Sequence, residues 1–250
     1  MKVTLIQLEV RPEEETSARV ARVARMLEDL EPADLILLPE LWDVGFTRFD
    51  RYRADAEPPD GPTARMLAQA AQARGCYLFG GSLVECDGGQ YYNTSLLFGP
   101  NGQLLTRYRK RHLFRFQSQE ATLLTPGQEL VSVSTSLAHF GFATCYDLRF
   151  PEHFRALVDR GVNCFLLPAA WPGSRMAHWR ILCQARALEN QSWLLACNCT
   201  GKTGGHSMVV NPRGEICLEA GVEPGVFSFH IRMEEAMQYR REFPVLEDRL

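Results

Sequence analysis

Short apolar segments alternate with amphipathic segments along almost the whole chain, and this alternation limits the fold more than any other feature. After Asp34, residues 35–39 are apolar and end at a proline, which is typical of a strand covered on both faces. Residues 13–30 instead carry apolar side chains at helical spacing, with Val20, Val23 and Leu27 on one face. The pattern predicts an α/β fold and argues against an all-helical or all-β chain.

The rest of the chain continues this pattern and adds two hairpins. Helices are expected over residues 62–74, 152–160 and 177–191. Strands are expected over residues 3–10, 76–85, 91–98, 103–108, 130–144, 162–167, 193–199, 205–212 and 215–219. Hairpins within a chain of alternating strands and helices predict a mixed sheet with helices outside it. We expect a single domain over residues 1–250, with a charged and irregular tail over 233–250.

Composition and charge argue against several classes of partner. A hydrophobic share of 46% is enough for one sizeable core, and a formal net charge of −3 gives no electrostatic reason to expect nucleic acid or an anionic membrane. No apolar run reaches the length of a membrane span, and Gln7 and Glu9 interrupt the N-terminal strand where a signal peptide would be apolar. These features predict a cytoplasmic protein.

The chain has eight cysteines but no C-x-x-C pair, and most of them lie in apolar segments. Reduced thiols in the core account for this distribution in a chain of this length. Cys197 and Cys199 could offer two thiolates to a metal ion, but no second cysteine pair or histidine stands at ligand spacing. The sequence therefore predicts no metal site.

Cys145 stands at a corner between a predicted strand at residues 139–144 and a helix that has Pro151 near its first turn and Gly161 just past its end. A cysteine at such a corner has backbone N–H groups and the positive end of a helix dipole close by. These surroundings are expected to lower the pKa of the thiol, and they can hold an oxyanion. The alternative is a buried cysteine that serves only as a small apolar side chain.

Two further polar residues stand at the ends of predicted strands. Glu40 directly follows the strand that ends at Pro39, and Lys110 follows the second strand of the first hairpin. Side chains at strand ends are rigidly held beside clefts, so these two are expected to meet Cys145 in one site. Taken alone, Glu40 could be an exposed loop acid, and Lys110 lies in a basic run at 107–111 that could be a solvated patch.

Together, a thiol, a carboxylate and an ammonium group make a complete site for acyl transfer. The carboxylate can accept the thiol proton, and the ammonium group, beside a backbone N–H, can stabilise the oxyanion that forms when sulfur attacks a carbonyl or nitrile carbon. A histidine is the more familiar base for a cysteine. His153 would point along its helix away from the corner, but a Cys–His pair with His112 or His178 stays open as an alternative.

Several motifs give the chain a wider resemblance. They are Leu37-Leu-Pro-Glu40-Leu-Trp, Tyr108-Arg-Lys110-Arg-His-Leu-Phe114, Ala143-Thr-Cys145-Tyr-Asp-Leu-Arg-Phe-Pro-Glu152, Ala177-His-Trp-Arg, Ala185-Arg-Ala-Leu-Glu-Asn190, Cys197-Asn-Cys-Thr-Gly201 and Gly205-His-Ser-Met-Val-Val-Asn-Pro212. Through these motifs, in this order, the chain resembles the nitrilase superfamily of carbon–nitrogen hydrolases. The resemblance implies that Glu40, Lys110 and Cys145 form the catalytic set. It also implies that Glu120 positions Lys110 and the hydrolytic water.

The resemblance extends to fold and assembly. Members of the superfamily have an α-β-β-α sandwich of two mixed β-sheets flanked by helices, which here implies a catalytic core over about residues 1–221. They pair through outer helices, so a homodimer is expected, with the helices at 151–160 and 177–191 as candidates for the interface. Either helix could instead pack only against its own sheet.

Within the superfamily, the chain resembles the omega-amidase branch through Cys145-Tyr-Asp-Leu-Arg-Phe150 and Trp171-Pro-Gly-Ser-Arg175. That resemblance implies hydrolysis of the distal amide of a 2-oxo acid such as 2-oxoglutaramate. The reaction would pass through a thioester on Cys145, with water as the second substrate and with no metal or organic cofactor.

A 2-oxo acid carries a carboxylate, so its site is expected to hold a cation beyond Lys110. Arg149 and Arg175 are the candidates, because a guanidinium group binds a carboxylate through two parallel hydrogen bonds. Arg149 could instead pair with Glu152 or Asp147. Three aromatic residues could wall the pocket, although such residues are as often part of a core. They are Phe46, Tyr146 and Trp171.

Other functions stay open. Three other enzymes are alternatives within the same class: deaminated-glutathione amidase, N-carbamoyl amino acid hydrolase and nitrilase. They differ in the shape of the pocket, which the sequence does not specify. A catalytically silent binding protein is expected to lack a member of the Glu-Lys-Cys set, and the set is complete here. A redox-sensing thiol protein needs a resolving cysteine, so Cys164 or Cys183 would have to approach Cys145 in space.

Overall fold

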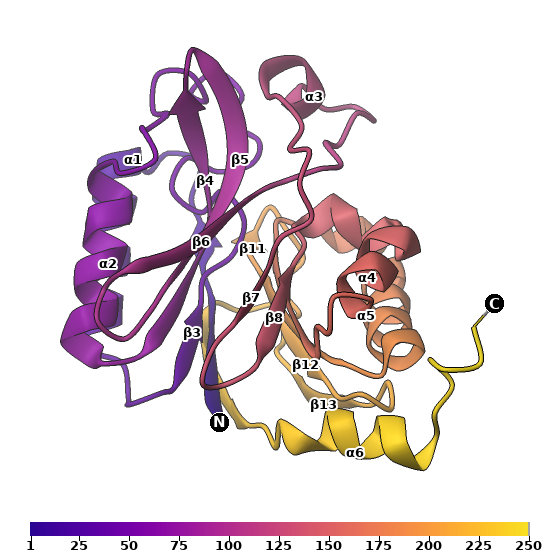
Figure 1. Cartoon of the computed structure of the whole chain (residues 1–250). Coiled ribbons are helices and arrows are strands. Elements are labelled where there is room, and N and C mark those ends of the chain that lie inside the picture. Colours follow the sequence, from indigo (N-terminus) through magenta and orange to yellow (C-terminus); the bar gives the residue numbers. More distant parts are fainter. Residues whose placement is uncertain (250) are drawn as a thin grey trace.

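Two six-stranded sheets lie face to face at the centre of the computed structural model, which describes residues 1–249 (Figure 1). The first sheet has the order β14 (Gly225–His230), β1 (Lys2–Gln7), β3 (Leu35–Leu37), β4 (Tyr77–Asp87), β5 (Gln90–Phe98) and β6 (Leu104–Arg109). The second has the order β13 (Ile216–Glu219), β12 (Met208–Val210), β10 (Trp193–Asn198), β9 (Cys164–Ala169), β8 (His139–Phe142) and β7 (Ser132–Ser134). A separate pair joins β2 (Glu9–Val10) to β11 (Thr200–Gly201).

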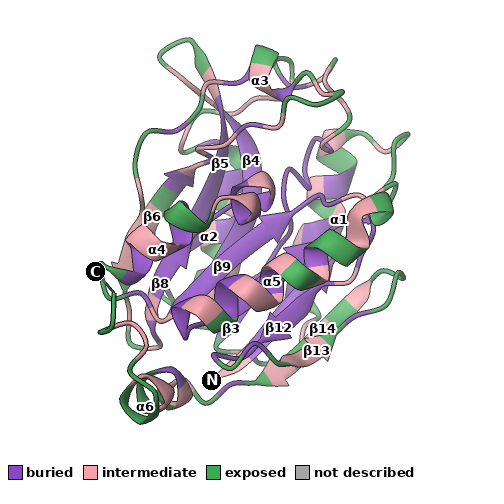
Figure 2. Ribbon diagram, turned by 90° about the vertical axis from the view of Figure 1, so that its right-hand side faces the viewer, coloured by how far each residue is buried: buried purple, intermediate pink, exposed green. Residues whose placement is uncertain are grey.

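Helices cover the outer face of each sheet. The first sheet is covered by α1 (Thr16–Glu28) and α2 (Pro62–Arg74), and the second by α4 (Pro151–Val158) and α5 (Met176–Asn190) (Figures 1 and 2). Other helices lie in the connections and the tail, namely α3 (Glu120–Leu123), η1 (Cys145–Arg149), η2 (Gly173–Arg175) and α6 (Glu234–Glu242). The expected α-β-β-α sandwich of two mixed sheets is confirmed.

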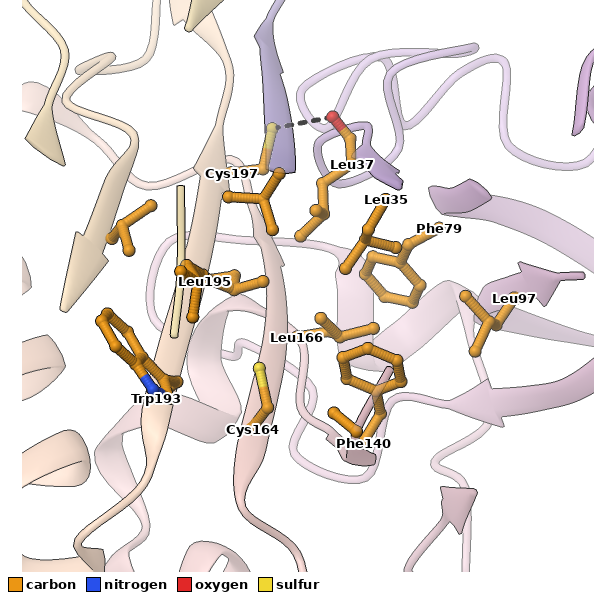
Figure 3. Packing of buried hydrophobic residues seen from close by; sticks show 14 of the residues in the cluster. Leu35, Leu37, Phe79, Leu97, Phe140, Cys164, Leu166, Trp193, Leu195 and Cys197 are labelled. Atoms are coloured by element: carbon orange, nitrogen blue, oxygen red, sulfur yellow. Dashed lines mark hydrogen bonds between the residues drawn. The ribbon is translucent and has the colours of Figure 1, made fainter. Parts of the chain in front are cut away.

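Strands β3 and β9 are apolar throughout, and both of their faces are buried. In β3, Leu35 and Leu37 belong to the core between the two sheets, whereas Ile36 packs beneath α1 and α2. In β9, Leu166 points into the same inter-sheet core and Phe165 packs beneath the helices of the second sheet. The inter-sheet core is therefore built from alternate residues of strands in both sheets (Figure 3).

Each sheet contains three neighbouring parallel strands, and polar chain segments meet at the carboxyl ends of these strands. Strands β1, β3 and β4 run parallel in the first sheet, as do β8, β9 and β10 in the second. The segment after β3 meets the end of β9, where the backbone N–H of Glu40 donates to the carbonyl oxygen of Ala169 at 3.4 Å. Ligands of α/β sheets gather at such carboxyl ends.

The C-terminal part departs from the expectation of an irregular tail. Residues 234–242 form α6, whose Ala236 is buried against the inter-sheet core. Strand β14, for which we predicted no strand, pairs antiparallel with β1 along its whole length. Both elements depend on contacts with distant segments, because α6 has few apolar residues and β14 is the edge strand of its sheet. Among residues 1–249, no helix is both long and apolar enough to cross a membrane.

A register shift in β4 brings this strand close to the segment that carries Glu40. Gly81 lies in the shift with a φ of +64°, and a Cβ atom added there would stand 1.9 Å from the carbonyl oxygen of Pro39. The next residue, Ser82, donates its N–H to the same oxygen at 3.1 Å. Only glycine therefore permits this close approach of two backbones.

We expect Gly81→Ala to lower the free energy of unfolding by about 3 kcal/mol or more, since left-handed backbone strain adds to the clash with Pro39. The matched control is Gly75→Ala, because Gly75 has a φ of +60° but no atom within 4 Å of an added Cβ. Gly75→Ala should lower the free energy of unfolding by only about 1–2 kcal/mol. Urea denaturation of both variants measures the difference, and equal costs would contradict the close approach.

Candidate active site

A buried group of charges lies where the segments after β3 and β6 meet α3. Glu40, Lys110 and Glu120 have almost no exposed surface. The Nζ atom of Lys110 lies 2.8 Å from Oε1 of Glu40, and 2.9 Å and 3.0 Å from the two carboxylate oxygens of Glu120. One ammonium group thus holds two carboxylates that are far apart in sequence.

Asn93 of β5 also joins both carboxylates. Its Nδ2 atom donates to Oε1 of Glu40 at 2.9 Å and to Oε1 of Glu120 at 3.0 Å. Asn93 was not among the site residues predicted from the sequence. Asn93 begins a run of three polar residues, Asn93-Thr94-Ser95, which precedes the apolar end of β5. Such a run within a strand is a usable signal, because a buried amide needs hydrogen-bond partners.

Each carboxylate has a further backbone donor that fixes its orientation. The N–H of Ala170, just beyond β9, donates to Oε2 of Glu40 at 2.9 Å. The N–H of Phe114 donates to Oε2 of Glu120 at 2.7 Å. Both sheets therefore contribute to the position of Glu40.

Cys145 is the first residue of η1 and lies at the strained corner that follows β8. Its φ of +45° is in the left-handed region, which a non-glycine residue adopts at an energetic cost. Thr144 and Asp147 stabilise the corner by reciprocal capping, in which the N–H of Thr144 donates to Oδ2 of Asp147 at 2.8 Å. The N–H of Tyr146 lies in the first turn of η1, where N–H groups have no acceptor within the helix.

The surroundings of Cys145 raise the pKa of its thiol well above the ordinary value, which corrects our expectation of a lowered pKa. Burial is the main cause, and the charge of Glu40 adds to it, whereas Lys110 acts in the opposite direction. The helix that was expected to lower the pKa begins only at Pro151. The thiol is therefore protonated at neutral pH and needs a base, and Glu40 is its hydrogen-bonding neighbour.

The charges of the group stabilise one another against burial. Burial alone would lower the pKa of Lys110, but the charges of Glu120 and Glu40 outweigh it and raise that pKa. Burial raises the pKa of Glu120, Lys110 opposes this shift, and Glu40 reinforces it. The ammonium group is therefore permanently charged at this site, which suits it to the stabilisation of a negative oxygen.

The histidines considered as partners of Cys145 are engaged elsewhere. His153 donates from Nε2 to the carbonyl oxygen of Phe142 at 2.7 Å, and Nδ1 of His178 lies 3.3 Å from Arg149. Nδ1 of His112 lies 2.6 Å from Asp147. No histidine hydrogen bond to Cys145 occurs within residues 1–249, so the Cys–His alternative has no geometric support.

His112, Asp147 and His153 are close enough together to be considered as metal ligands. Their polar atoms already have partners, however. Asp147 accepts hydrogen bonds from the hydroxyl group of Tyr108 at 2.6 Å and from the N–H groups of Thr144 and His112. This cluster ties the chain beside Lys110 to the corner of Cys145, and its hydrogen bonds account for its buried carboxylate.

The cysteines in the described part of the chain are all free thiols. Those considered for a metal donate to backbone carbonyl groups: Cys197 to Ile6 at 3.3 Å, and Cys199 to Glu40 at 3.5 Å. These contacts place both thiols in the core beside the strand that leads to Glu40.

A cavity of about 200 Å³ opens at Cys145. All five residues that we predicted as substrate contacts line it, namely Phe46, Tyr146, Arg149, Trp171 and Arg175. Besides Cys145, the other lining residues were not predicted from the sequence; they are Thr47, Phe114, Phe116, Gln117, Ala170, Pro172, Lys202 and Thr203. Most of these come from loops whose mutual positions no local pattern specifies.

The wall of the cavity is cationic. Arg149, Arg175 and Lys202 line it, and none of them forms an ion pair with a carboxylate among residues 1–249. The guanidinium group of Arg149 lies 4.8 Å from the ring centre of Trp171, and that of Arg175 lies 5.7 Å from the ring of Phe114. Aromatic faces thus hold the two guanidinium groups. One nitrogen of Arg149 lies 3.3 Å from Nδ1 of His178, and the remaining guanidinium N–H groups of Arg149 and Arg175 form no hydrogen bond within residues 1–249, so they can bind a ligand.

Comparisons with known proteins agree with this geometry. A family model described as carbon-nitrogen hydrolase matches residues 2–241. A 2-oxoglutaramate amidase of Paenarthrobacter nicotinovorans is 34% identical, and the alignment covers 100% of this chain and 89% of the relative.

Two solved structures have the same fold at high similarity. The CN-hydrolase superfamily protein XC1258 of Xanthomonas campestris, which has an arsenic adduct in its active site, superimposes with a TM-score of 0.92 at 29% identity, covering 100% of this chain and 97% of that one. A mutant of the amidase from Nesterenkonia sp. AN1 superimposes with a TM-score of 0.84 at 26% identity, again covering 100% and 97%. In that mutant, the acetamide moiety of fluoroacetamide is covalently added at the active-site cysteine.

The position of Glu40 beside Cys145 gives a prediction with a definite sign. Because the charge of Glu40 helps to raise the pKa of the thiol and Lys110 lowers it, Glu40→Gln should move the ionisation of Cys145 to lower pH. The ultraviolet absorbance of the thiolate, taken as the difference from Cys145→Ala, measures this ionisation. In the unmodified protein it should occur only well above pH 9.

Glu28→Gln is the control for this titration, since Glu28 ends α1 on the outer surface. It should leave the ionisation of Cys145 unchanged. An upward shift in Glu40→Gln would contradict the arrangement of charges described above.

Proposed function

The chain belongs to the carbon–nitrogen hydrolase family, and we propose that it hydrolyses the distal amide of a 2-oxo acid, converting 2-oxoglutaramate and water to 2-oxoglutarate and ammonia. It is a hydrolase that acts on carbon–nitrogen bonds other than peptide bonds. The observation that carries the choice of substrate is the cationic wall of the cavity at Cys145, where three cations lack a carboxylate partner within residues 1–249. A substrate with a free carboxylate supplies the missing anion.

The first half of the proposed reaction forms a thioester. Glu40 accepts the proton of Cys145 while the sulfur atom attacks the amide carbon, and the carbonyl oxygen becomes an oxyanion. One N–H of Lys110 bonds Glu40 and a second is shared by the oxygens of Glu120, so a third is free for the oxyanion. The N–H of Tyr146 is the second donor. Glu40 then protonates the leaving nitrogen, and ammonia departs.

The second half hydrolyses the thioester. Glu40 takes a proton from water, and the hydroxide attacks the thioester carbon, with the oxyanion held by the same two donors. The C–S bond breaks, Glu40 returns the proton that it took from water to the sulfur of Cys145, and the acid is released. Glu120 keeps Lys110 in place through both halves and orients the water. The route needs no metal and no organic cofactor, because Lys110 and a backbone N–H supply the electrophilic groups.

The rest of the substrate fits the proposed contacts. Arg149 and Arg175 bind the carboxylate, with Lys202 at the rim, and the aromatic side chains of Phe46 and Trp171 enclose the carbon chain. A small, partly apolar cavity with a few directed polar groups is typical of a site for a compact metabolite.

We also propose that two copies pair through α4 and α5. Ile181 and Leu188 of α5 are large apolar side chains that are 65% and 48% exposed. Helix α5 itself lies on the outer face of the second sheet (Figure 2). Burial of these side chains against a second copy would remove their apolar surface from water. We further propose a cytoplasmic location, where a reducing environment keeps the free thiols reduced.

The substrate proposal predicts a preference that can be measured. Ammonia release should be fastest from 2-oxoglutaramate in a panel that also contains a nitrile, an N-carbamoyl amino acid and the oxo amide derived from glutathione. Arg175→Gln should raise KM for 2-oxoglutaramate about 10- to 100-fold, since a hydrogen bond to a charged group is lost. It should change the KM of a short uncharged amide very little.

Cys145→Ala is the control for turnover and should release no ammonia and form no acyl adduct detectable by mass spectrometry. The panel contradicts the proposal if another member is hydrolysed faster than 2-oxoglutaramate. The proposal is also contradicted if Arg175→Gln raises KM equally for charged and uncharged amides.

The pairing proposal predicts a mass of two chains by light scattering, and a mass of one chain for Ile181→Glu, because a buried unpaired charge opposes association. Val226→Glu is the matched control, since Val226 is 45% exposed but lies on β14, away from α5. A mass of one chain for the unmodified protein would contradict the proposal.

A further inference from the structure

Asn93 contacts every charged member of the buried group. Its side chain donates one hydrogen bond to Glu40 and one to Glu120, at 2.9 Å and 3.0 Å. Its backbone carbonyl oxygen accepts the N–H of Lys110 at 2.8 Å. Asn93 is 1% exposed and lies on β5, between the segment of Glu40 and the strand that leads to Lys110.

The contacts close a ring of hydrogen bonds. Lys110 and Asn93 both donate to Oε1 of Glu40, and both also donate to Oε1 of Glu120. The lysine alone would leave two carboxylates facing one another across a single cation. The amide adds a second bridge between them without adding charge, through two N–H bonds fixed in one plane.

The buried charges explain why a neutral bridge matters. Two carboxylates and one ammonium group carry a net charge of −1 at a site closed to solvent. Hydrogen bonds to a carboxylate favour its ionised form, whereas burial and a neighbouring negative charge oppose ionisation. Glu120 is subject to both of the opposing effects, since burial and the charge of Glu40 each raise its pKa.

We propose that Asn93 is a positioning residue that holds Glu40 and Glu120 at a fixed distance and in a fixed orientation, so that one serves as the base for Cys145 and the other orients the water. This inference rests on the proposed function for its role in turnover. The hydrogen bond from Asn93 also favours the ionised form of Glu120, and this effect does not depend on the identity of the substrate.

The other groups that face the carboxylates do not replace the amide. Lys110 is already bonded to both, and Cys145 is a protonated thiol that faces Glu40. Tyr52 is buried in the same region and experiences the charges of both carboxylates, but its hydroxyl group donates to the carbonyl oxygen of Phe46 at 2.7 Å. Asn93 is therefore the single uncharged side chain among residues 1–249 that donates to both carboxylates.

The test uses Asn93→Leu, which keeps the approximate shape of the side chain and removes both donors. We expect kcat to fall about 10- to 100-fold while KM changes less than about threefold, because the lost bonds are to the charged groups of the reaction and not to the substrate. The acid limb of the pH profile of kcat should move up by about one pH unit, since Glu120 without this donor protonates more easily.

Infrared difference spectroscopy gives a second readout that needs no substrate. The C=O stretch of a protonated carboxyl group should appear at higher pH in Asn93→Leu than in the unmodified protein. This measurement separates the two proposals, because it can succeed even if no amide in the panel is hydrolysed. Asn93→Asp should also lower kcat, because a carboxyl group offers at most one donor where the amide offers two.

Thr94→Val is the matched control. Thr94 is the next residue of β5, is 2% exposed, and donates to the buried carboxylate of Glu85. The control should lose a similar hydrogen bond but leave kcat and its pH profile unchanged. If Asn93→Leu keeps full kcat, or loses activity only in proportion to unfolding with an unshifted acid limb and carboxyl band, the positioning role is wrong.

Discussion

The ammonium group of Lys110, enclosed by two carboxylates and closed to solvent, is the interaction on which the site depends. Removal of water from three charges is costly, and their mutual attraction offsets that cost only when their geometry is well fixed. Each side chain comes from a different segment, so the fold must bring the ends of β3 and β6 to α3 before the charges can stabilise one another. The sandwich provides this rigidity through a core shared by both sheets.

The strained corner at Cys145 is a second consequence of the same architecture. A residue with a φ of +45° persists only where its surroundings determine its conformation, and here Asp147 supplies much of that constraint. Asp147 accepts hydrogen bonds from Tyr108 and His112, on either side of Lys110, and from Thr144 beside the cysteine. The segment of the cation and the segment of the nucleophile are therefore fixed to one buried carboxylate.

The sequence predicted the elements that depend on local patterns and strand ends. It placed Glu40, Lys110 and Cys145 at the ends of strands, and the sandwich of two mixed sheets is confirmed. It did not predict Asn93, because the role of Asn93 depends on which side of β5 faces the buried charges. The direction of the pKa shift of Cys145 was also wrong, because the shift is set by burial and by Glu40, and burial is a property of the packed molecule.

The distribution of charge within the site has a consequence for the orientation of a substrate. The buried group carries a net negative charge beside Cys145, whereas the wall of the cavity carries Arg149 and Arg175. A substrate carboxylate is therefore repelled from the cysteine and attracted to the wall, so a neutral amide at the other end of a short chain is directed to the sulfur atom. The same field disfavours the acid product at Cys145, because hydrolysis converts the neutral amide to a second carboxylate. Orientation of the substrate and release of the product thus follow from one arrangement of charges.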